Sequence, residues 1–179
     1  MKKEELLRAG CMVPDTLQEA MRSGRQEMAE GDEEALEAYI CRLLEENGRE
    51  NTYFDFYFGV LSEEERSKAE TVLSSEQVQY LHEYGLPDSR EDVYFPFEES
   101  LFAIALRLSV TQMLFSTFYF PVLRKTVWSS YEGNLLSFHM IRRRKGTIIN
   151  ADFGRCGCLS GSGNCGKLAR ERKIRDTFV

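Results

Sequence analysis

The sequence has few of the residues that enzymes use for acid–base or nucleophilic chemistry near neutral pH. It contains only two histidines, His82 and His139, among 179 residues. A catalytic cysteine or serine needs a neighbouring base, so few such pairs can form, and the sequence places no third residue to orient either imidazole ring. The composition therefore favours a binding protein over an enzyme.

Long apolar runs are also missing. The longest one, 101–114, is interrupted by Arg107 and Gln112, and it is shorter than the roughly 20 residues of a membrane-spanning helix. Near the amino terminus, Glu4 and Glu5 interrupt any stretch that could form the apolar core of a secretory signal. We therefore expect a cytoplasmic protein without membrane contact, in a compartment where thiols stay reduced.

Charge is divided unevenly along the chain. Residues 1–139 hold 26 acidic and 13 basic side chains, whereas residues 140–179 hold 3 acidic and 10 basic ones. The basic end either docks on the acidic body or offers a surface to an anionic partner such as nucleic acid. The acidic body also allows an alternative function, as a protein-interaction module or a mimic of nucleic acid.

Apolar residues at helical spacing, together with capping residues, predict helices in the first two-thirds of the chain. Asp32 and Gly48 have the positions of an N-cap and a C-terminal cap. Ser62 and Ser74 each begin a capping box. The predicted helices cover 15–30, 32–47, 62 onward, 74–84 and 98–114. The last is apolar around nearly its whole circumference, so we expect it at the centre of the core.

Beyond residue 115, short segments rich in β-branched and aromatic residues predict strands. The simplest arrangement is an antiparallel meander of 126–131, 135–142 and 147–153, in which Ser137 and His139 share one face. The predicted fold class is α+β, mainly helical at first, with a small sheet later. We expect residues 1–153 to form one globular domain and residues 154–179 a basic appendage rich in cysteine and glycine.

Three cysteines in the appendage form the most distinctive pattern, C-x-C-x6-C at Cys156, Cys158 and Cys165. The glycines between them allow the backbone to turn tightly and bring thiolates together. A structural zinc site needs four ligands, so a fourth must come from elsewhere. His139 is the preferred donor because its strand precedes the segment by one hairpin. The other candidate donors are Cys11, Cys41, His82 and Asp152. An iron–sulfur cluster is the second choice of cofactor.

Other readings of this segment stay open. Cys158 and Cys165 could instead serve a thiol-based redox sensor or a thiol-dependent enzyme. Gly161–Lys167 satisfies part of a nucleotide-binding loop, but Leu168 replaces the residue that would bind magnesium. The predicted anion-binding residues are Arg142, Arg143, Arg144, Lys145, Lys167, Arg170, Arg172 and Lys173. The leading hypothesis is a regulatory protein with a protein partner, a zinc-binding cysteine cluster and a basic face for an anionic partner, nucleic acid among them.

Overall fold

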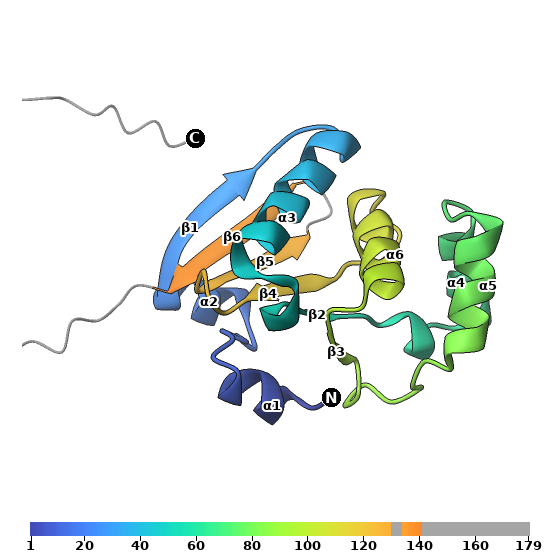
Figure 1. Ribbon diagram of the computed structural model, residues 1–179, viewed down its shortest axis with the longest axis horizontal. Coiled ribbons are helices and arrows are strands. Elements are labelled where there is room, and N and C mark those ends of the chain that lie inside the picture. The colour runs from blue at the N-terminus through green and yellow to red at the C-terminus, as the bar shows by residue number, and fades with distance from the viewer. Residues whose placement is uncertain (130–133, 141–179) are drawn as a thin grey trace, which may run out of the picture. The chain divides into compact units, whose positions relative to one another are not determined.

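The fold combines helices with one antiparallel sheet and is of the α+β class (Figure 1). It is seen in a computed structural model, which describes residues 1–129 and 134–140. The α-helices are α1 (Lys3–Arg8), α2 (Leu17–Ser23), α3 (Glu33–Asn47), α4 (Glu63–Glu70), α5 (Ser75–Tyr84) and α6 (Glu99–Val110). Short 3-10 helices are η1 (Arg49–Asn51) and η2 (Phe58–Val60). The strands are β1 (Gly24–Ala29), β2 (Tyr53–Asp55), β3 (Tyr94–Pro96), β4 (Thr117–Phe120), β5 (Lys125–Ser129) and β6 (Leu135–Met140).

Local capping interactions set several helix ends where the sequence predicts them. The Asp32 side chain accepts a hydrogen bond from the backbone N–H of Ala35 at the start of α3. Ser62 and Ser74 form complete capping boxes at the starts of α4 and α5. Gly85 follows α5 with a φ of 70°, a left-handed conformation that costs glycine little. These ends depend on contacts within a few residues, which explains why the sequence reveals them.

The sheet has six strands in the order β1-β6-β5-β4-β2-β3, and every neighbouring pair is antiparallel. Three of these strands, β1, β2 and β3, precede residue 97. The sequence pattern predicts a sheet confined to the later part of the chain. The structure shows that three of its strands come from the earlier part. The sheet is assembled from segments across the described chain, because strand partners need only be close in space.

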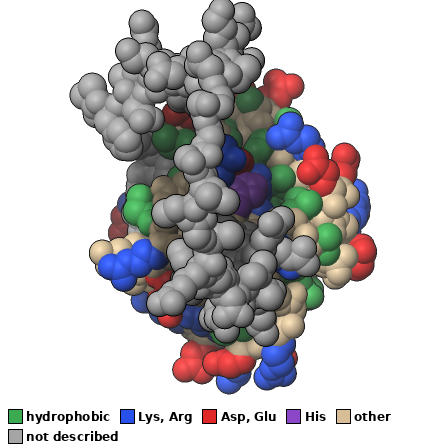
Figure 2. Space-filling model, turned by 90° about the vertical axis from the view of Figure 1, so that its left-hand side faces the viewer, with side chains coloured by type: hydrophobic (Ala, Val, Ile, Leu, Met, Phe, Trp, Pro, Cys, Tyr) green, Lys and Arg blue, Asp and Glu red, His purple; other side chains and the backbone are tan. Residues whose placement is uncertain are grey.

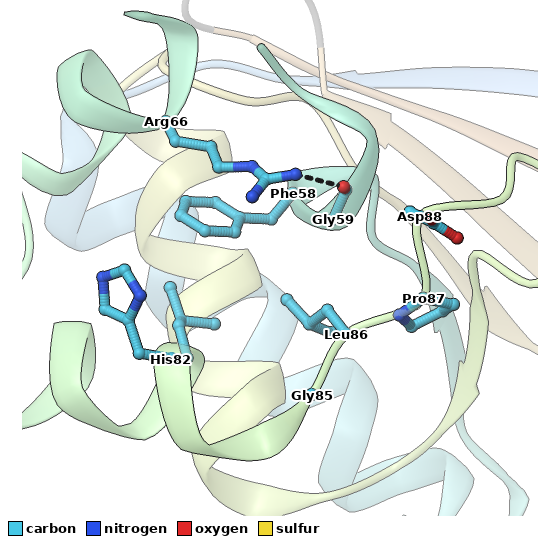
Figure 3. Close-up of a pocket in the computed structure, with 9 residues that line it drawn as sticks. Phe58, Gly59, Arg66, His82, Gly85, Leu86, Pro87 and Asp88 are labelled. Carbon is cyan, nitrogen blue, oxygen red and sulfur yellow. Dashed lines mark hydrogen bonds between the residues drawn. The ribbon is translucent and has the colours of Figure 1, made fainter. Parts of the chain in front are cut away.

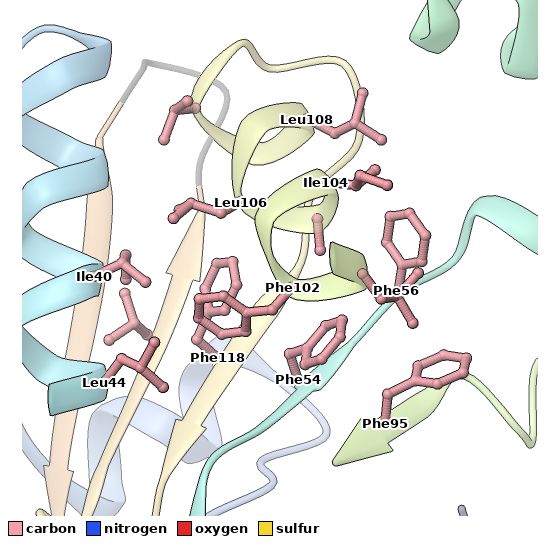
Figure 4. Packing of buried hydrophobic residues seen from close by; sticks show 14 of the residues in the cluster. Ile40, Leu44, Phe54, Phe56, Phe95, Phe102, Ile104, Leu106, Leu108 and Phe118 are labelled. Carbon is pink, nitrogen blue, oxygen red and sulfur yellow. The ribbon is translucent and has the colours of Figure 1, made fainter. Parts of the chain in front are cut away.

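The core lies between the sheet and the two helices α3 and α6. Figure 4 shows Ile40 and Leu44 of α3 on one side of Phe118, and Phe102 of α6 close to Phe118 and Phe54. The rings of Phe102 and Phe118 have centroids 5.3 Å apart, and those of Phe54 and Phe102 are 5.4 Å apart. Eight of the twelve residues of α6 are buried, in line with its largely apolar circumference. On the opposite sheet face, Leu6 and Cys11 pack against Tyr119.

One prediction about secondary structure is wrong. The helix predicted over 15–30 ends at Ser23, and residues 24–29 form strand β1. Gly24 weakens the helix locally, and six residues of β1 gain a full register of partners on β6, from Gly24 opposite Met140 to Ala29 opposite Leu135. β1 thereby takes the place beside β6 that the meander predicts for 147–153. Residues 147–153, and the predicted boundary at residue 153, lie outside the described residues.

Within residues 1–129 and 134–140, no helix has both the length and the apolar character needed to cross a bilayer.

Candidate functional site

One row of residues across the sheet changes from apolar to polar. Reading from β2 to β1, the register aligns Phe54, Phe118, Val127, Ser137 and Glu27 on the face that α3 and α6 cover. In the next row on that face, the register places Lys125 of β5 opposite His139 of β6, and His139 opposite Arg25 of β1. The β1–β6–β5 end of the sheet therefore gathers charged and hydroxyl side chains beneath α3.

Glu27 and His139 form the outer part of this polar cluster. The His139 Nε2 atom lies 2.8 Å from Glu27 Oε2, a hydrogen bond between residues 112 positions apart. The ammonium group of Lys125 forms an ion pair with the same carboxylate oxygen at 3.6 Å. The hydrogen bond from His139 is the main cause that lowers the pKa of Glu27, and the positive charge of Lys125 adds to it. Glu27 is thus a carboxylate shared by two nitrogen donors.

Tyr39 of α3 completes the inner part. Its hydroxyl oxygen lies 2.7 Å from Ser137 Oγ and accepts a hydrogen bond from Lys125 Nζ at 3.1 Å. Lys125 Nζ also lies 5.4 Å from the centroid of the Tyr39 ring. The side chain of Lys125 is only 9% exposed. A buried ammonium group is costly unless it is paired, and Glu27 with Tyr39 offsets that cost here.

The five side chains form one connected chain of contacts from the surface to the interior. His139 is partly exposed, whereas Ser137 has no solvent-accessible surface. Ser137 is therefore not placed to attack a substrate, and a nucleophilic serine assisted by His139 does not fit this geometry. Figure 2 shows one side of the molecule, with acidic, basic and apolar side chains interspersed at the surface. The cluster can orient the His139 ring and hold the negative charge of Glu27 beside it.

Of the preferred metal ligands and the predicted anion-binding residues, only His139 belongs to the described residues. The structure places it in the polar cluster, on the same face as Ser137, as its strand pattern predicts. The three thiols and the eight predicted anion-binding cations lie outside the described residues. That the three thiols converge on a metal therefore stays a prediction. Within residues 1–129 and 134–140, no group of three or more His, Cys, Asp or Glu side chains could hold a metal ion.

The two alternative cysteines that the structure describes suit a metal less well than His139 does. Cys11 is buried beside Leu6 and Tyr119, and burial raises the pKa of its thiol to about 12. Burial and two nearby glutamates also raise the pKa of the Cys41 thiol. Both effects disfavour the thiolate that binds metal. His82 belongs to another part of the fold, where its Nε2 atom pairs with Glu70 at 3.1 Å.

Three members of the cluster, Glu27, Tyr39 and Lys125, are not marked by any sequence motif. Glu27 lies in a segment with a predicted helical pattern, and Tyr39 has the spacing of an apolar helix face. Lys125 offers the one available signal, because it begins a strand otherwise rich in β-branched and aromatic residues. Only the pairing of β1 with β6 and of β6 with β5 brings them together.

A second buried ionisable group lies at the other end of the sheet, on its opposite face. Asp55 of β2 accepts hydrogen bonds from the backbone N–H of Thr117 at 2.6 Å and from the Tyr119 hydroxyl at 3.2 Å. Burial outweighs these hydrogen bonds and raises the pKa of Asp55 from 3.8 to about 6. Burial and the nearby Asp55 carboxylate also raise the pKa of Tyr119. Within the described residues, neither Asp55 nor Tyr119 forms an ion pair with a basic side chain.

Comparisons with protein-family models, with curated proteins and with solved structures found no match to this chain.

Proposed function

We propose that this chain is a regulatory binding protein that holds a zinc ion with Cys156, Cys158, Cys165 and His139. The observation that supports the proposal is the 2.8 Å hydrogen bond between His139 Nε2 and Glu27. Histidines that bind metal usually donate their other ring N–H to a carboxylate, which fixes the orientation of the ring. Glu27 supplies that carboxylate before any metal is bound.

The donor set fits zinc in chemistry. Nε2 of His139 is taken by Glu27, and Nδ1 has no hydrogen-bond partner among the described residues, so Nδ1 is the nitrogen that would bind the metal. Three thiolates and one imidazole make a closed tetrahedral set of the kind that structural zinc sites use. Such a site stabilises the fold around it and has no open position for catalysis.

The proposal also assigns a role to the basic residues that follow β6. Arg142, Arg143, Arg144 and Lys145 come directly after the strand that carries His139, and further cations follow the last cysteine. A metal-ordered segment with this charge would present its cations to an anionic partner, for which we propose nucleic acid. Because phosphate contacts release counterions, its binding would weaken steeply with rising salt.

The first test measures metal content. Full-length protein purified without chelator is analysed for zinc, together with Cys158→Ser, His139→Gln and Glu27→Gln. We expect one zinc per chain in the unaltered protein and none in Cys158→Ser. Glu27→Gln keeps the shape of the side chain but removes its charge, so zinc affinity should fall about 10- to 100-fold. His82→Gln is the matched control and should keep full zinc content.

Two results would contradict the proposal. Negligible zinc in the unaltered protein, after addition of one equivalent and dialysis, would rule out the metal site. Full zinc affinity in His139→Gln would rule out His139 as the fourth ligand. Alkylation kinetics then separate metal binding from a redox role, since bound zinc protects all three thiols together, whereas a redox pair has one thiol that reacts much faster.

The second test measures the anionic partner. A fluorescent DNA duplex is titrated with the full-length protein at several salt concentrations, beside a variant in which Arg142, Arg143, Arg144 and Lys145 are all replaced by Gln. We expect a steep salt dependence for the unaltered protein and a shallower slope for the variant. No binding at low salt would exclude nucleic acid as the partner while leaving the zinc site untouched.

A further inference from the structure

A pocket that includes no residue of the polar cluster lies among η2, α4, α5 and the loop that follows α5. Its volume is about 480 Å³, within the range of small-molecule sites. Its apolar wall consists of Phe58, Leu81, Leu86 and Pro87. Arg66 of α4 and His82 of α5 add polar groups at its edge. Figure 3 shows the Arg66 guanidinium beside the ring of Phe58, with Leu86 on the other side of the pocket.

The backbone around the pocket is held by a close approach at Gly59. A Cβ atom at this position would lie 2.1 Å from the carbonyl oxygen of Pro87, so only glycine fits. Gly85 turns the chain out of α5 with a φ of 70°. η2 and the 85–88 loop are therefore packed backbone to backbone on one side, which makes this wall rigid. A rigid wall allows the pocket to be pre-formed.

Arg66 has N–H donors that form no hydrogen bond within the described residues. Its Nη2 atom donates to the carbonyl oxygen of Gly59 at 2.5 Å. Its Nε atom is buried and has no hydrogen-bond partner among the described residues. The guanidinium forms no other hydrogen bond within the described residues, although it carries five N–H donors. A buried arginine donor without an acceptor is rare in native structures and indicates a missing acceptor.

Acidic groups near the pocket do not satisfy this capacity. Glu70 pairs with the His82 ring at 3.1 Å. The carboxylate of Asp88 points away from Arg66 in Figure 3. Arg66 therefore has no carboxylate partner among residues 1–129 and 134–140, and the two acids nearby disfavour a ligand with more than one negative charge.

We propose that this pocket binds a small monocarboxylate with an aliphatic body. The carboxylate accepts hydrogen bonds from Nε and a terminal nitrogen of Arg66, a two-point geometry that guanidinium and carboxylate groups share. The aliphatic body packs against Phe58, Leu81 and Leu86. A single guanidinium matches a single carboxylate, whereas a phosphate dianion would leave charge uncompensated beside an apolar wall. The site uses none of the residues of the proposed zinc centre.

The test uses 4-methylpentanoate as the probe, with two comparison compounds. 4-Methylpentanamide has the same body without the charge, and acetate has the charge without the body. Binding to the full-length protein is followed by ¹H–¹⁵N spectra, with the amide signals of Gly85 and Leu86 as reporters. We expect the acid to shift these signals saturably, and the amide and acetate to bind about tenfold or more weakly.

Variants separate the two halves of the site. Arg66→Gln should weaken binding of 4-methylpentanoate about tenfold or more, and Arg66→Lys should weaken it less because the charge remains. Leu86→Phe keeps Arg66 and fills the space for the aliphatic body, so it should also weaken binding about tenfold. Arg107→Gln is the matched control. Arg107 does not line the pocket, and its guanidinium pairs with the Glu33 carboxylate at 2.8 Å. Its replacement should therefore leave binding unchanged.

Clear results would overturn the inference. Equal affinity for the acid and the amide would show an apolar cleft without carboxylate recognition. The unaltered protein could also show no saturable shift at about 10 mM acid, which corresponds to a binding free energy of less than about 3 kcal/mol. That result would show that the pocket has no ligand of this class. If Arg66→Gln fails to fold, the comparison of acid with amide and the Leu86→Phe variant decide the question.

Discussion

Phe118 and Ser137 lie two strands apart in the same row of the sheet, and both side chains are fully buried. Phe118 is surrounded by other apolar groups, among them the ring of Phe102. Ser137 needs a hydrogen-bond partner, and Tyr39 supplies it from α3. Burial at the apolar end is stabilising through removal of apolar surface from water. Burial at the polar end is tolerated only because distant segments provide matching donors and acceptors.

The comparison predicts the largest loss of stability at the apolar end. Phe118→Ala should lower the free energy of unfolding by about 3–5 kcal/mol, because it leaves a cavity between α6 and the sheet. Met28→Ala is the matched control in the same sheet, since Met28 is 59% exposed and its truncation should change stability by less than about 0.5 kcal/mol. Urea denaturation measures both. Similar losses in the two variants would mean that the core is not concentrated under α6.

Asp55→Asn should have the next largest effect, and it should be stabilising at neutral pH. The folded-state pKa of Asp55 is raised from 3.8 to about 6, so the folded protein holds this proton over a pH range in which the unfolded chain has lost it. Stability from this group therefore falls as the pH rises from about 4 to about 6, by up to about 3 kcal/mol.

Urea denaturation of Asp55→Asn between pH 4 and 8 measures that dependence. The variant should lack this pH-dependent loss and be more stable than the unaltered protein at pH 8. If the variant is instead less stable at pH 8, the hydrogen bonds that Thr117 and Tyr119 donate to the ionised carboxylate outweigh its desolvation.

Tyr39→Phe tests the inner part of the polar cluster. It removes the hydroxyl that pairs with both Ser137 and Lys125 and leaves buried polar groups without a partner, so stability should fall by about 1–3 kcal/mol. Ser137→Ala in combination should cost less than the sum of the two single changes, with a coupling of about 1 kcal/mol. Strict additivity in this double-mutant cycle would show that the two hydroxyls do not act as a pair.

Glu27→Gln should have the smallest effect on the stability of the zinc-free protein. The hydrogen bond with His139 lowers the pKa of Glu27 below its ordinary value of 4.5. The ionised carboxylate therefore stabilises the fold above pH 4.5, and this stabilisation is lost as the pH falls through the lowered pKa. Because the Glu27 side chain is 44% exposed, the change should amount to less than about 1 kcal/mol at pH 7. A loss as large as that of Tyr39→Phe would place Glu27 in the buried part of the network instead.

Helices α3 to α6 could be predicted because their signals are local. Asp32, Ser62 and Ser74 cap helices through contacts three residues away, and Gly85 ends a helix by its own conformational freedom. The apolar circumference of α6 also identifies it as a core helix. The shared face of Ser137 and His139 follows from the alternation of side chains within one strand.

Strand pairing and the polar cluster depend instead on contacts between distant segments. Residues 24–29 carry a pattern that also suits a helix, and they form a strand because β6 offers six residues of backbone to pair with. Glu27 and His139 are 112 residues apart, so no spacing in the sequence could reveal their hydrogen bond. Local capping energies determine where helices begin and end. The choice of strand partners, and with it the site around His139, is made only when the whole sheet assembles, because each pairing is stabilised by burial that the other strands and helices provide.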